Sequence, residues 1–505
     1  MKNNVGMHLQ FLLMRDLWKW GHDMADDRLK IVKYINDPVY GGIGITKIEL
    51  ALIDTPIFQR LRGLRQLARV NFVFPGAEHS RYVHSLGVLY IMGIMTEHLL
   101  KQGMLNEEDV VKLRVAALLH DIGHYPLSHL GESVYGYCLD NQNATSIVEV
   151  QPTANEKRLY EMASSHSKSA HHEHLGKYIV TNNDTIKNIL VENGLNPLEI
   201  GEIFTGEYGS RNMVYTQLLH SSLDADRLDY LLRDSYQTGV KYGLVDLQYL
   251  IRLLMVVEDP NLSENNKVLV CNKKGQHVVE HFLMSRYFHY SQVIFHKTNA
   301  AFEGMIRCMY IKLVQSDHFL FNSLDAIHDN INNECFLQFN DAFLETALKE
   351  YYNVTPDEEY KRLYEMYRDR IRPKVVFEAK DLYEKSPRQE FAVLKWELKR
   401  NPSKITEIVG SDRWGYQIVP ITLEKVHGYY GISERDINEE DLREAVKLYD
   451  PDTNKISYLA EDQLSVISKL ANYKSEFVRI YVLEERGKVY DYNKMHQDIC
   501  ALITS

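Results

Sequence analysis

Several residue types that mark large protein classes are scarce in this 505-residue sequence. It contains only five cysteines and no Cys-x-x-Cys pair; the cysteines are Cys138, Cys271, Cys308, Cys335 and Cys500. Widely spaced cysteines in odd number are typical of reduced thiols, so we expect no disulfides and no zinc ribbon. Linkers rich in proline, or in glycine and serine, are also missing from the sequence. These features predict a folded protein of the cytoplasm.

The sequence also lacks a surplus of positive charge and a long apolar run. Lysine and arginine number 58 against 69 aspartate and glutamate residues, which gives a formal net charge of −11. This balance argues against a general nucleic-acid or membrane-surface binder, so a polyanionic substrate would need a local basic pocket. The apolar patch near the N-terminus is interrupted by Arg15 and Asp16 and is too short to span a membrane. We expect no membrane partner, whereas specific nucleic-acid binding stays open.

The residues that are abundant predict a mainly α fold. A hydrophobic content of 45% with 25% charged residues is typical of a folded globular chain. From residue 47 to residue 130 apolar residues recur every three to four positions, which predicts successive helices. Asn106, which precedes three acidic residues, predicts a helix start, and Gly123 with Pro126 predicts a helix stop. We also expect a strand and turn at 267–275 and a long helix at 275–314.

The composition changes after about residue 330. A charged helical segment is followed by three β-like runs, KVVFEA, WGYQIVPITL and EFVRIYVLEERGKVYDY. We therefore predict an N-terminal extension at residues 1–27, an all-helical core at 28–330, and a smaller α+β lobe at 331–505.

The segment LLHDIGHYPLSH, residues 118–129, ends an apolar helical run with several titratable groups. These groups are His120, Asp121, His124 and His129. Together with His84 and Asp226 on neighbouring predicted helices, His120 and Asp121 make a set of two imidazoles and two carboxylates. Such a set suits Mn, Fe, Mg or Zn and leaves coordination positions for water or substrate. Taken singly, each residue is more simply explained as a satisfied core histidine or as one partner of a salt bridge.

The order of these residues resembles a known superfamily. The motifs are RYVHSLGV (81–88), LLHDIGHYPLSH (118–129) and DADRLDY (224–230). They resemble the HD-domain phosphohydrolases, whose signature is H, then HD, then D on successive helices. More narrowly, the chain is similar to the deoxynucleoside triphosphate (dNTP) triphosphohydrolases, the group that includes the human protein with a sterile-alpha-motif and an HD domain. The similarity runs from INDPVYGGIGITKIELALIDTPIFQRLRGLRQL (35–67) to about residue 310.

The resemblance implies a role for each matching residue. The implied metal ligands are His84, His120, Asp121 and Asp226. The implied catalytic residues are His129, His124, His172 and Glu173, with Glu132 close to them. The implied substrate-binding residues are Gln66, Arg81, Arg227, Tyr230, Asp234 and Arg286, where the arginines bind the triphosphate and the others hold the deoxyribose.

The resemblance also implies a reaction, the hydrolysis of dNTPs to deoxynucleoside and inorganic triphosphate. A divalent cation would lower the pKa of a bound water from 15.7 toward about 7. The leaving sugar alkoxide needs a proton donor, for which His129 is the first choice and His124 the second. Arginine clamps suit a substrate with several negative charges.

A second implied feature is activation by GTP or a dNTP, with Mg, bound between the subunits of a homotetramer. The matching regulatory residues are Lys33, Asp54, Gln59, Arg62, Val73, Phe74, His296 and Lys297. Two departures affect specificity: Ile294 stands where the family commonly has an aromatic residue, and Tyr249 where a nucleotide-binding arginine is expected. The alternative for residues 54–62 is an ordinary amphipathic helix with an Asp-Thr-Pro start.

Two alternative functions belong beside the dNTP triphosphohydrolase. One is a different HD phosphohydrolase activity, acting on nucleoside monophosphates or on a signalling nucleotide. The other is a non-catalytic nucleotide or nucleic-acid sensor that keeps the fold. HHEHL does not have the zinc-protease H-E-x-x-H spacing, and GGIGI does not match a phosphate loop, so the sequence gives only weak support to those two classes.

Overall fold

The computed structural model describes residues 25–144, 170–210, 212–260, 267–383, 386–410, 414–422, 445–462, 464–471, 473–484 and 487–504. Nearly all of the predicted extension at 1–27 lies outside these ranges. The helices up to residue 314 are α2 (Lys47–Ile53), α3 (Pro56–Gln59), α4 (Arg81–Lys101), α5 (Glu107–Leu119), α6 (His129–Ala144), α7 (His172–Asn182), α8 (Asp184–Glu192), α9 (Pro197–Phe204), α10 (Met213–Leu219), α11 (Ala225–Thr238), α12 (Leu247–Arg252), α13 (Gln276–His289) and α14 (Lys297–Val314). The later helices are α15 (Leu324–His328), α16 (Glu334–Leu337), α17 (Asp341–Val354), α18 (Glu358–Arg368), α19 (Gln389–Arg400), α20 (Pro402–Val409), α23 (Val466–Ala471) and α24 (Tyr492–Thr504).

Three small sheets accompany the helices. The strands are β1 (Ile31–Asp37), β2 (Gly41–Thr46), β3 (Leu254–Glu258), β4 (Lys267–Asn272), β5 (Lys374–Tyr383), β6 (Trp414–Thr422), β7 (Lys447–Asp450), β8 (Lys455–Tyr458) and β9 (Lys474–Val482). β1 and β2 form a hairpin, β3-β4-β7-β8 form a mixed sheet in which β4 and β7 are parallel, and β5-β9-β6 form an antiparallel sheet. The fold is therefore mainly α with a smaller α+β C-terminal region, as predicted.

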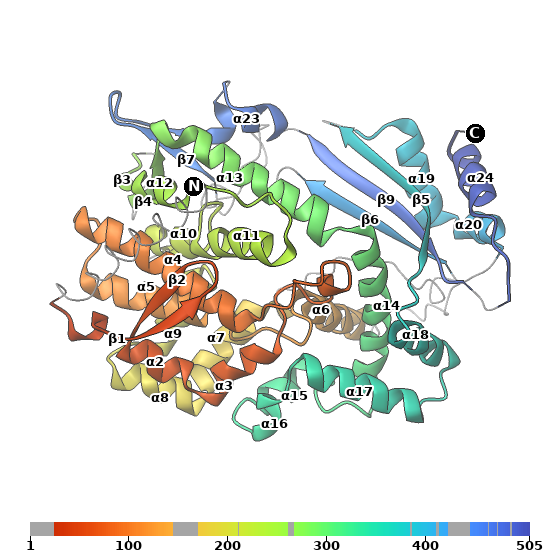
Figure 1. The fold of residues 1–505 in the computed structure, drawn as a ribbon, viewed down its shortest axis with the longest axis horizontal. Coiled ribbons are helices and arrows are strands. Elements are labelled where there is room, and N and C mark those ends of the chain that lie inside the picture. The colour runs from red at the N-terminus through yellow and green to blue at the C-terminus, as the bar shows by residue number, and fades with distance from the viewer. Residues whose placement is uncertain are drawn as a thin grey trace, which may run out of the picture.

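Helix α4 is the central helix of the larger core. It lies against α5 and α11 (Figure 1). Its apolar residues, such as Val88, Ile91 and Met92, are fully buried. Among the described residues α4 is the one helix long and apolar enough to cross a membrane, with a mean hydropathy of 1.3, and 67% of that window is buried inside the protein. Its apolar length is explained by its position between other helices.

Helix α5 begins and ends where the sequence predicts. Asn106 caps its first turn: its side chain accepts the Asp109 N–H, while the Asp109 carboxylate accepts the Asn106 N–H. The helix ends at Leu119 with His120 at its C-cap, and the chain turns sharply through Gly123. Leu127 and Ser128 then take left-handed backbone angles, with φ of 62° and 55°, immediately before α6. The turn from 120 to 129 therefore has its own fixed shape.

The long helix expected at 275–314 is interrupted, so this prediction was wrong in detail. α13 ends at His289, a π-helical turn follows at Tyr290–Ile294, and α14 starts at Lys297. The side chain of His296 accepts the Thr298 N–H and caps the new helix. Periodicity alone could not predict the break, because apolar residues continue through it at helical spacing.

The C-terminal region has a hydrophobic core of its own. Residues of β5, β6 and β9 pack against α19, α20 and α24, with Trp414, Ile480 and Leu394 at the centre. In Figure 1 this sheet lies beside the helical body, next to α14. Helices α15–α18, by contrast, pack on the larger core. The Arg479 guanidinium of β9 donates to the Phe295 carbonyl (2.7 Å) and joins the two regions.

Candidate metal centre

The four predicted metal ligands come together from three helices. His84 lies in the first turn of α4, His120 and Asp121 follow the last residue of α5, and Asp226 lies in the first turn of α11. The His84 Nε2 atom is 2.9 Å from Asp226 Oδ1 and 3.6 Å from Asp121 Oδ2. The His120 Nε2 atom is 3.4 Å from Asp121 Oδ1 and 3.8 Å from Asp226 Oδ1. His84, His120 and Asp121 therefore form one compact group of ligand atoms, and Asp226 lies within 3.8 Å of both histidines.

The histidines of this cluster are oriented as metal ligands. The His84 Nδ1–H group donates to Asp229 Oδ2 (2.7 Å), and the His120 Nδ1–H group donates to the Ala117 carbonyl (2.8 Å). Both Nε2 atoms are buried and face the Asp226 carboxylate, yet among the described residues neither forms a hydrogen bond of good geometry. Buried imidazole nitrogens that face carboxylate oxygens suit a shared cation, and a metal-ligating histidine commonly donates its other N–H to a carboxylate or carbonyl. The residues therefore fit a divalent cation.

Asp229 is a functional residue that the sequence analysis missed. Its carboxylate accepts the His84 Nδ1–H and receives the Arg233 guanidinium at Nε (2.8 Å), while Arg233 Nη1 also donates to Asp37 Oδ2 (2.7 Å). Asp229 and Arg233 are both completely buried. The signal was present, since Asp226 and Asp229 lie three residues apart on one helix face. The chain thus holds His84 in one tautomer and one orientation.

We predict that Asp229→Asn weakens binding of Mn²⁺ by about 10- to 100-fold. The neutral amide oxygen accepts the His84 Nδ1–H more weakly than the carboxylate does, so His84 becomes a poorer metal ligand. Titration of the metal-free protein with Mn²⁺, followed by electron paramagnetic resonance, measures this affinity. Asp246→Asn is the matched control, since Asp246 only caps α12 by accepting the Tyr249 N–H. Equal Mn²⁺ affinities for Asp229→Asn and the wild type would remove Asp229 from the account.

Asp121 is the most heavily engaged carboxylate of the site. It is buried and accepts from Arg81 Nη1 (2.7 Å) and lies 3.1 Å from His124 Nε2. Burial alone raises the pKa of Asp121, but Arg81 and His120 outweigh that effect and hold the pKa well below its usual range. Arg81 also donates to the Ser128 hydroxyl (3.0 Å). The structure thus places Arg81 on a predicted metal ligand, whereas the resemblance implied a contact with the triphosphate.

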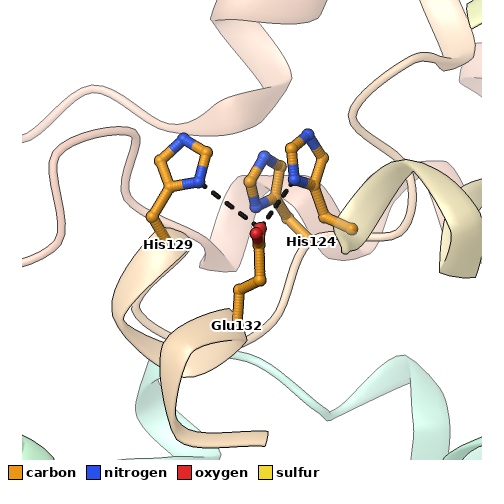
Figure 2. A group of neighbouring side chains, drawn as sticks. His124, His129 and Glu132 are labelled. Atoms are coloured by element: carbon orange, nitrogen blue, oxygen red, sulfur yellow. Dashed lines mark hydrogen bonds and ion pairs between the residues drawn. The ribbon is translucent and has the colours of Figure 1, made fainter. Parts of the chain in front are cut away.

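The implied catalytic histidines form a second group beside the metal centre. His129 Nδ1 lies 3.4 Å from Glu132 Oε2, and His172 Nδ1 lies 2.8 Å from the same oxygen. Figure 2 shows the His129 imidazole turned toward the Glu132 carboxylate, with His124 beside them. The rings of His124 and His172 stack with centroids 3.8 Å apart. One carboxylate therefore orients two imidazoles.

His124 and His129 differ in exposure. The His124 ring is completely buried, and burial together with Arg81 lowers its pKa well below the usual value. The His129 side chain is 68% exposed at the start of α6. The neutral, enclosed His124 imidazole and the exposed His129 imidazole, which pairs with Glu132, therefore suit different roles in the site.

Glu173 is placed on the outer side of the same group. Its carboxylate lies 3.3 Å from His171 Nδ1 and 3.4 Å from His220 Nε2. Burial raises the pKa of Glu173, but His220 and His171 lower it to about 2. Within the described part of the chain, the ion pairs of Glu173 are with these two histidines, and a catalytic role for Glu173 stays a prediction.

Some of the implied substrate-binding residues have free polar atoms. Gln66 Oε1 and the Nε and Nη1 atoms of Arg286 are buried and have no hydrogen-bond partner in the part of the chain that the structure describes. Tyr230 lies four residues after Asp226 on α11, with its ring 5.3 Å from the His289 ring. Unpaired buried donors and acceptors near a charged centre are expected where a polar ligand binds. These three residues are the strongest candidates for substrate contacts.

Arg227 and Asp234 are engaged by protein groups. Arg227 Nη1 donates to Asp224 Oδ2 (2.8 Å) and to the Ser221 carbonyl. Asp234 lies between two histidines that the sequence analysis did not single out: His79 Nε2 is 2.8 Å from Oδ1, and His289 Nε2 is 2.9 Å from Oδ2. Contacts of Arg227 and Asp234 with a substrate stay predictions.

The predicted regulatory residues include two pairs that are in contact, Gln59 with Arg62 and Phe74 with His296. Arg62 Nε donates to Gln59 Oε1 (2.6 Å) and its guanidinium lies 3.6 Å from the centre of the Tyr82 ring, while Asp54 is exposed at the end of α2. Phe74 and His296 are in contact, with ring centroids 5.8 Å apart. Of the other predicted regulatory residues, Val73 is half-buried, and Lys297 and Lys33, on β1, are exposed.

Comparison with known proteins gives one family match and several relatives. Residues 81–233 match the family "HD domain". The uncharacterized protein YwfO of Bacillus subtilis is 33% identical over 283 residues, which cover 55% of this chain and 55% of YwfO. The deoxynucleoside triphosphate triphosphohydrolase SAMHD1 of Homo sapiens is 30% identical over 254 residues, which cover 46% of this chain and 37% of SAMHD1. The chain thus spans about half, or less, of the length of these relatives.

A solved structure extends the likeness to most of the chain. The phosphohydrolase from Bacteroides thetaiotaomicron superposes with a TM-score of 0.58 at 25% identity and covers 90% of this chain and 100% of its own. The matched range 81–233 contains all four predicted metal ligands. The resemblance drawn from the sequence motifs is therefore confirmed for the HD domain and for its relation to SAMHD1.

Proposed function

We propose that this protein is a metal-dependent dNTP triphosphohydrolase. Its residues 81–233 match the HD domain, and the chain is similar to SAMHD1. The observation that carries the proposal is the clustering of His84, His120, Asp121 and Asp226, in which both buried Nε2 atoms face carboxylate oxygens. The HD phosphohydrolase relationship supports a metal-dependent hydrolase. The dNTP substrate and the release of triphosphate rest on the likeness to SAMHD1.

The metal ligands would hold a divalent cation, Mn, Mg, Fe or Zn, which supplies Lewis acidity and lowers the pKa of water toward neutrality. Asp121 is kept ionised by Arg81, and His84 is held by Asp229. Because these groups are buried and interlocked, the ligand geometry is set before substrate arrives.

His129 is the residue that donates the proton to the leaving deoxynucleoside oxygen in this proposal. Its Nδ1 atom is oriented by Glu132, so its Nε2 atom is directed away from that carboxylate, and its side chain is open to an incoming substrate. His124 is enclosed and lies against Asp121, which favours a role in shaping the phosphate site. A sugar alkoxide is a poor leaving group, so protonation by a positioned imidazole is needed.

The remaining contacts follow from free polar groups. The Arg286 guanidinium has two buried nitrogens without hydrogen-bond partners among the described residues and would bind the triphosphate, while Gln66 Oε1, which is likewise unpaired there, would bind the deoxyribose. Tyr230 is proposed as a deoxyribose contact on the resemblance alone. Two further parts are proposed on the resemblance alone: activation by GTP or a dNTP with Mg at the residues 54–62 and 296–297, and a cytoplasmic homotetramer.

Analysis of the products from each dNTP tests the function. With Mn²⁺ or Mg²⁺, and with GTP added in a second series, we expect tripolyphosphate and deoxynucleoside, resolved by ion-exchange chromatography and ³¹P NMR. An enzyme that cleaves between the phosphates would yield a deoxynucleoside monophosphate or diphosphate, whereas a nucleotidase specific for monophosphates, a signalling-nucleotide hydrolase or a sensor would leave the dNTP unchanged. Either result would reject the triphosphohydrolase.

A further inference from the structure

Arg60 is a buried cation whose hydrogen bonds, within the described residues, go to main-chain carbonyl oxygens. It lies in the short 3₁₀ turn η2 (Arg60–Gly63) after α3 and is 3% exposed. Its Nη2 atom donates to the Ile122 carbonyl (2.6 Å), and its Nη1 atom donates to the carbonyls of His124 and Phe339 (2.9 Å each). Its guanidinium lies 4.7 Å from the centre of the Phe336 ring. No carboxylate of the described chain forms an ion pair with it.

This placement calls for an explanation, because burying a charge without a counter-ion costs free energy. Burial lowers the pKa of Arg60 to about 9, so the guanidinium stays protonated at neutral pH. The planar fork of arginine can bind two carbonyls at fixed separation, which an ammonium group cannot do. The position is therefore suited to holding a particular backbone shape.

The backbone that Arg60 holds is the turn that carries the metal ligands and the histidines. Ile122 follows Asp121 directly, and the two bound carbonyls lie on either side of Gly123. On its other side this turn is packed against α7, where a Cβ atom at Gly123 would lie 2.2 Å from the His172 carbonyl oxygen. The turn is thus clamped between Arg60 and α7.

A second clamp holds the end of the same turn. Asp341, at the start of α17, accepts the Leu127 N–H at Oδ1 (2.8 Å) and the Arg65 N–H at Oδ2 (3.1 Å). Leu127 has a left-handed backbone, which costs free energy for a non-glycine residue. The segment around Phe339 and Asp341, far along the chain, therefore meets η2 and the 120–129 turn in one network.

We propose that Arg60 is a positioning residue: its guanidinium fixes the Ile122–His124 backbone and so sets the placement of Asp121 and His124 at the metal centre. The effect on turnover rests on the proposed function, whereas the effect on the backbone does not. Arg60 lies between the predicted regulatory residues Gln59 and Arg62. A shift of residues 59–62 would therefore be transmitted to the 120–129 turn by the Arg60 side chain.

The expected consequence of Arg60→Ala is a loss of about 100-fold in kcat with little change in KM, because a misplacement of about 1 Å of catalytic groups has an effect of this size. The loss should be partly reversed by millimolar guanidinium, which can occupy the space left by the side chain and donate to the same carbonyls. Arg69→Ala is the matched control, since Arg69 is also buried but pairs with Glu345, a residue outside the turn.

Hydrogen–deuterium exchange of the full-length, metal-free protein tests the proposal without any turnover. We expect faster exchange in peptides covering 119–130 in Arg60→Ala, recovery on addition of guanidinium, and unchanged exchange of this peptide in Arg69→Ala. Unchanged exchange of 119–130 in Arg60→Ala, or equal acceleration in Arg69→Ala, would overturn the positioning role. If the wild type hydrolyses no dNTP, the proposed function fails, while the exchange result still decides the role of Arg60.

Discussion

Asp121→Asn is expected to lower dNTP turnover by about a thousandfold or more. The carboxylate is shared between the predicted metal site, Arg81 and His124, so an amide loses a charged ligand and leaves the Arg81 guanidinium buried without its partner. Lewis-acid activation contributes several kcal/mol to the transition state, and each 1.36 kcal/mol is tenfold in rate. Turnover at saturating Mn²⁺ and dNTP measures the loss.

The control separates lost chemistry from lost folding. Asp184→Asn changes the same functional group at the exposed start of α8 and should leave both turnover and thermal stability unchanged. Breaking the buried Arg81 pair costs about 3–5 kcal/mol, so Asp121→Asn should also unfold at a lower temperature while remaining folded at 25 °C. A folded Asp121→Asn protein with wild-type turnover would show that the centre of hydrolysis lies elsewhere.

His129→Ala is expected to lower turnover of dNTPs by about 10² to 10⁴, the range for loss of a positioned acid. The effect should depend on the leaving group. A nucleoside 5′-(p-nitrophenyl phosphate) releases a phenolate that needs no proton, so its hydrolysis should be much less affected by this change. Initial rates with both substrates, for the wild type and the variant, give the comparison.

His174→Ala is the matched control for this experiment, since His174 is an exposed histidine on α7 that lies 3.8 Å from Glu207. It should leave both rates unchanged. His124→Ala should lower both rates together, because His124 shapes the site irrespective of the leaving group. If His129→Ala lowers the hydrolysis rates of both substrates equally, His129 contributes to substrate binding and is not the general acid.

Short-range patterns predicted much of the fold and the core of the site. The capping box at Asn106 and the apolar spacing of α5 place His120 and Asp121 at a helix end, as the sequence indicates. The H, HD, D motifs also predicted which ligands converge, because their side chains come from helices that share one core. The three C-terminal β-like runs form one antiparallel sheet.

Long-range contacts could not be predicted in this way. Arg60 binds carbonyls 62, 64 and 279 residues away, and Asp341 binds an N–H 214 residues away; neither has a local signature. The assignment of Arg81 to Asp121, and of Arg227 to Asp224, likewise depends on tertiary placement. Residue type and family position predict that these arginines are important, but only the fold determines which group each one meets.

The most direct measurement of the central claim is the fate of oxygen from water. Hydrolysis of a dNTP in H₂¹⁸O, with mass spectrometry of both products, reports which phosphorus atom is attacked. Attack at the α-phosphorus predicts one ¹⁸O atom in tripolyphosphate and none in the deoxynucleoside, and this labelling should be lost in Asp121→Asn. Label in orthophosphate or pyrophosphate, with no tripolyphosphate formed, would contradict the account.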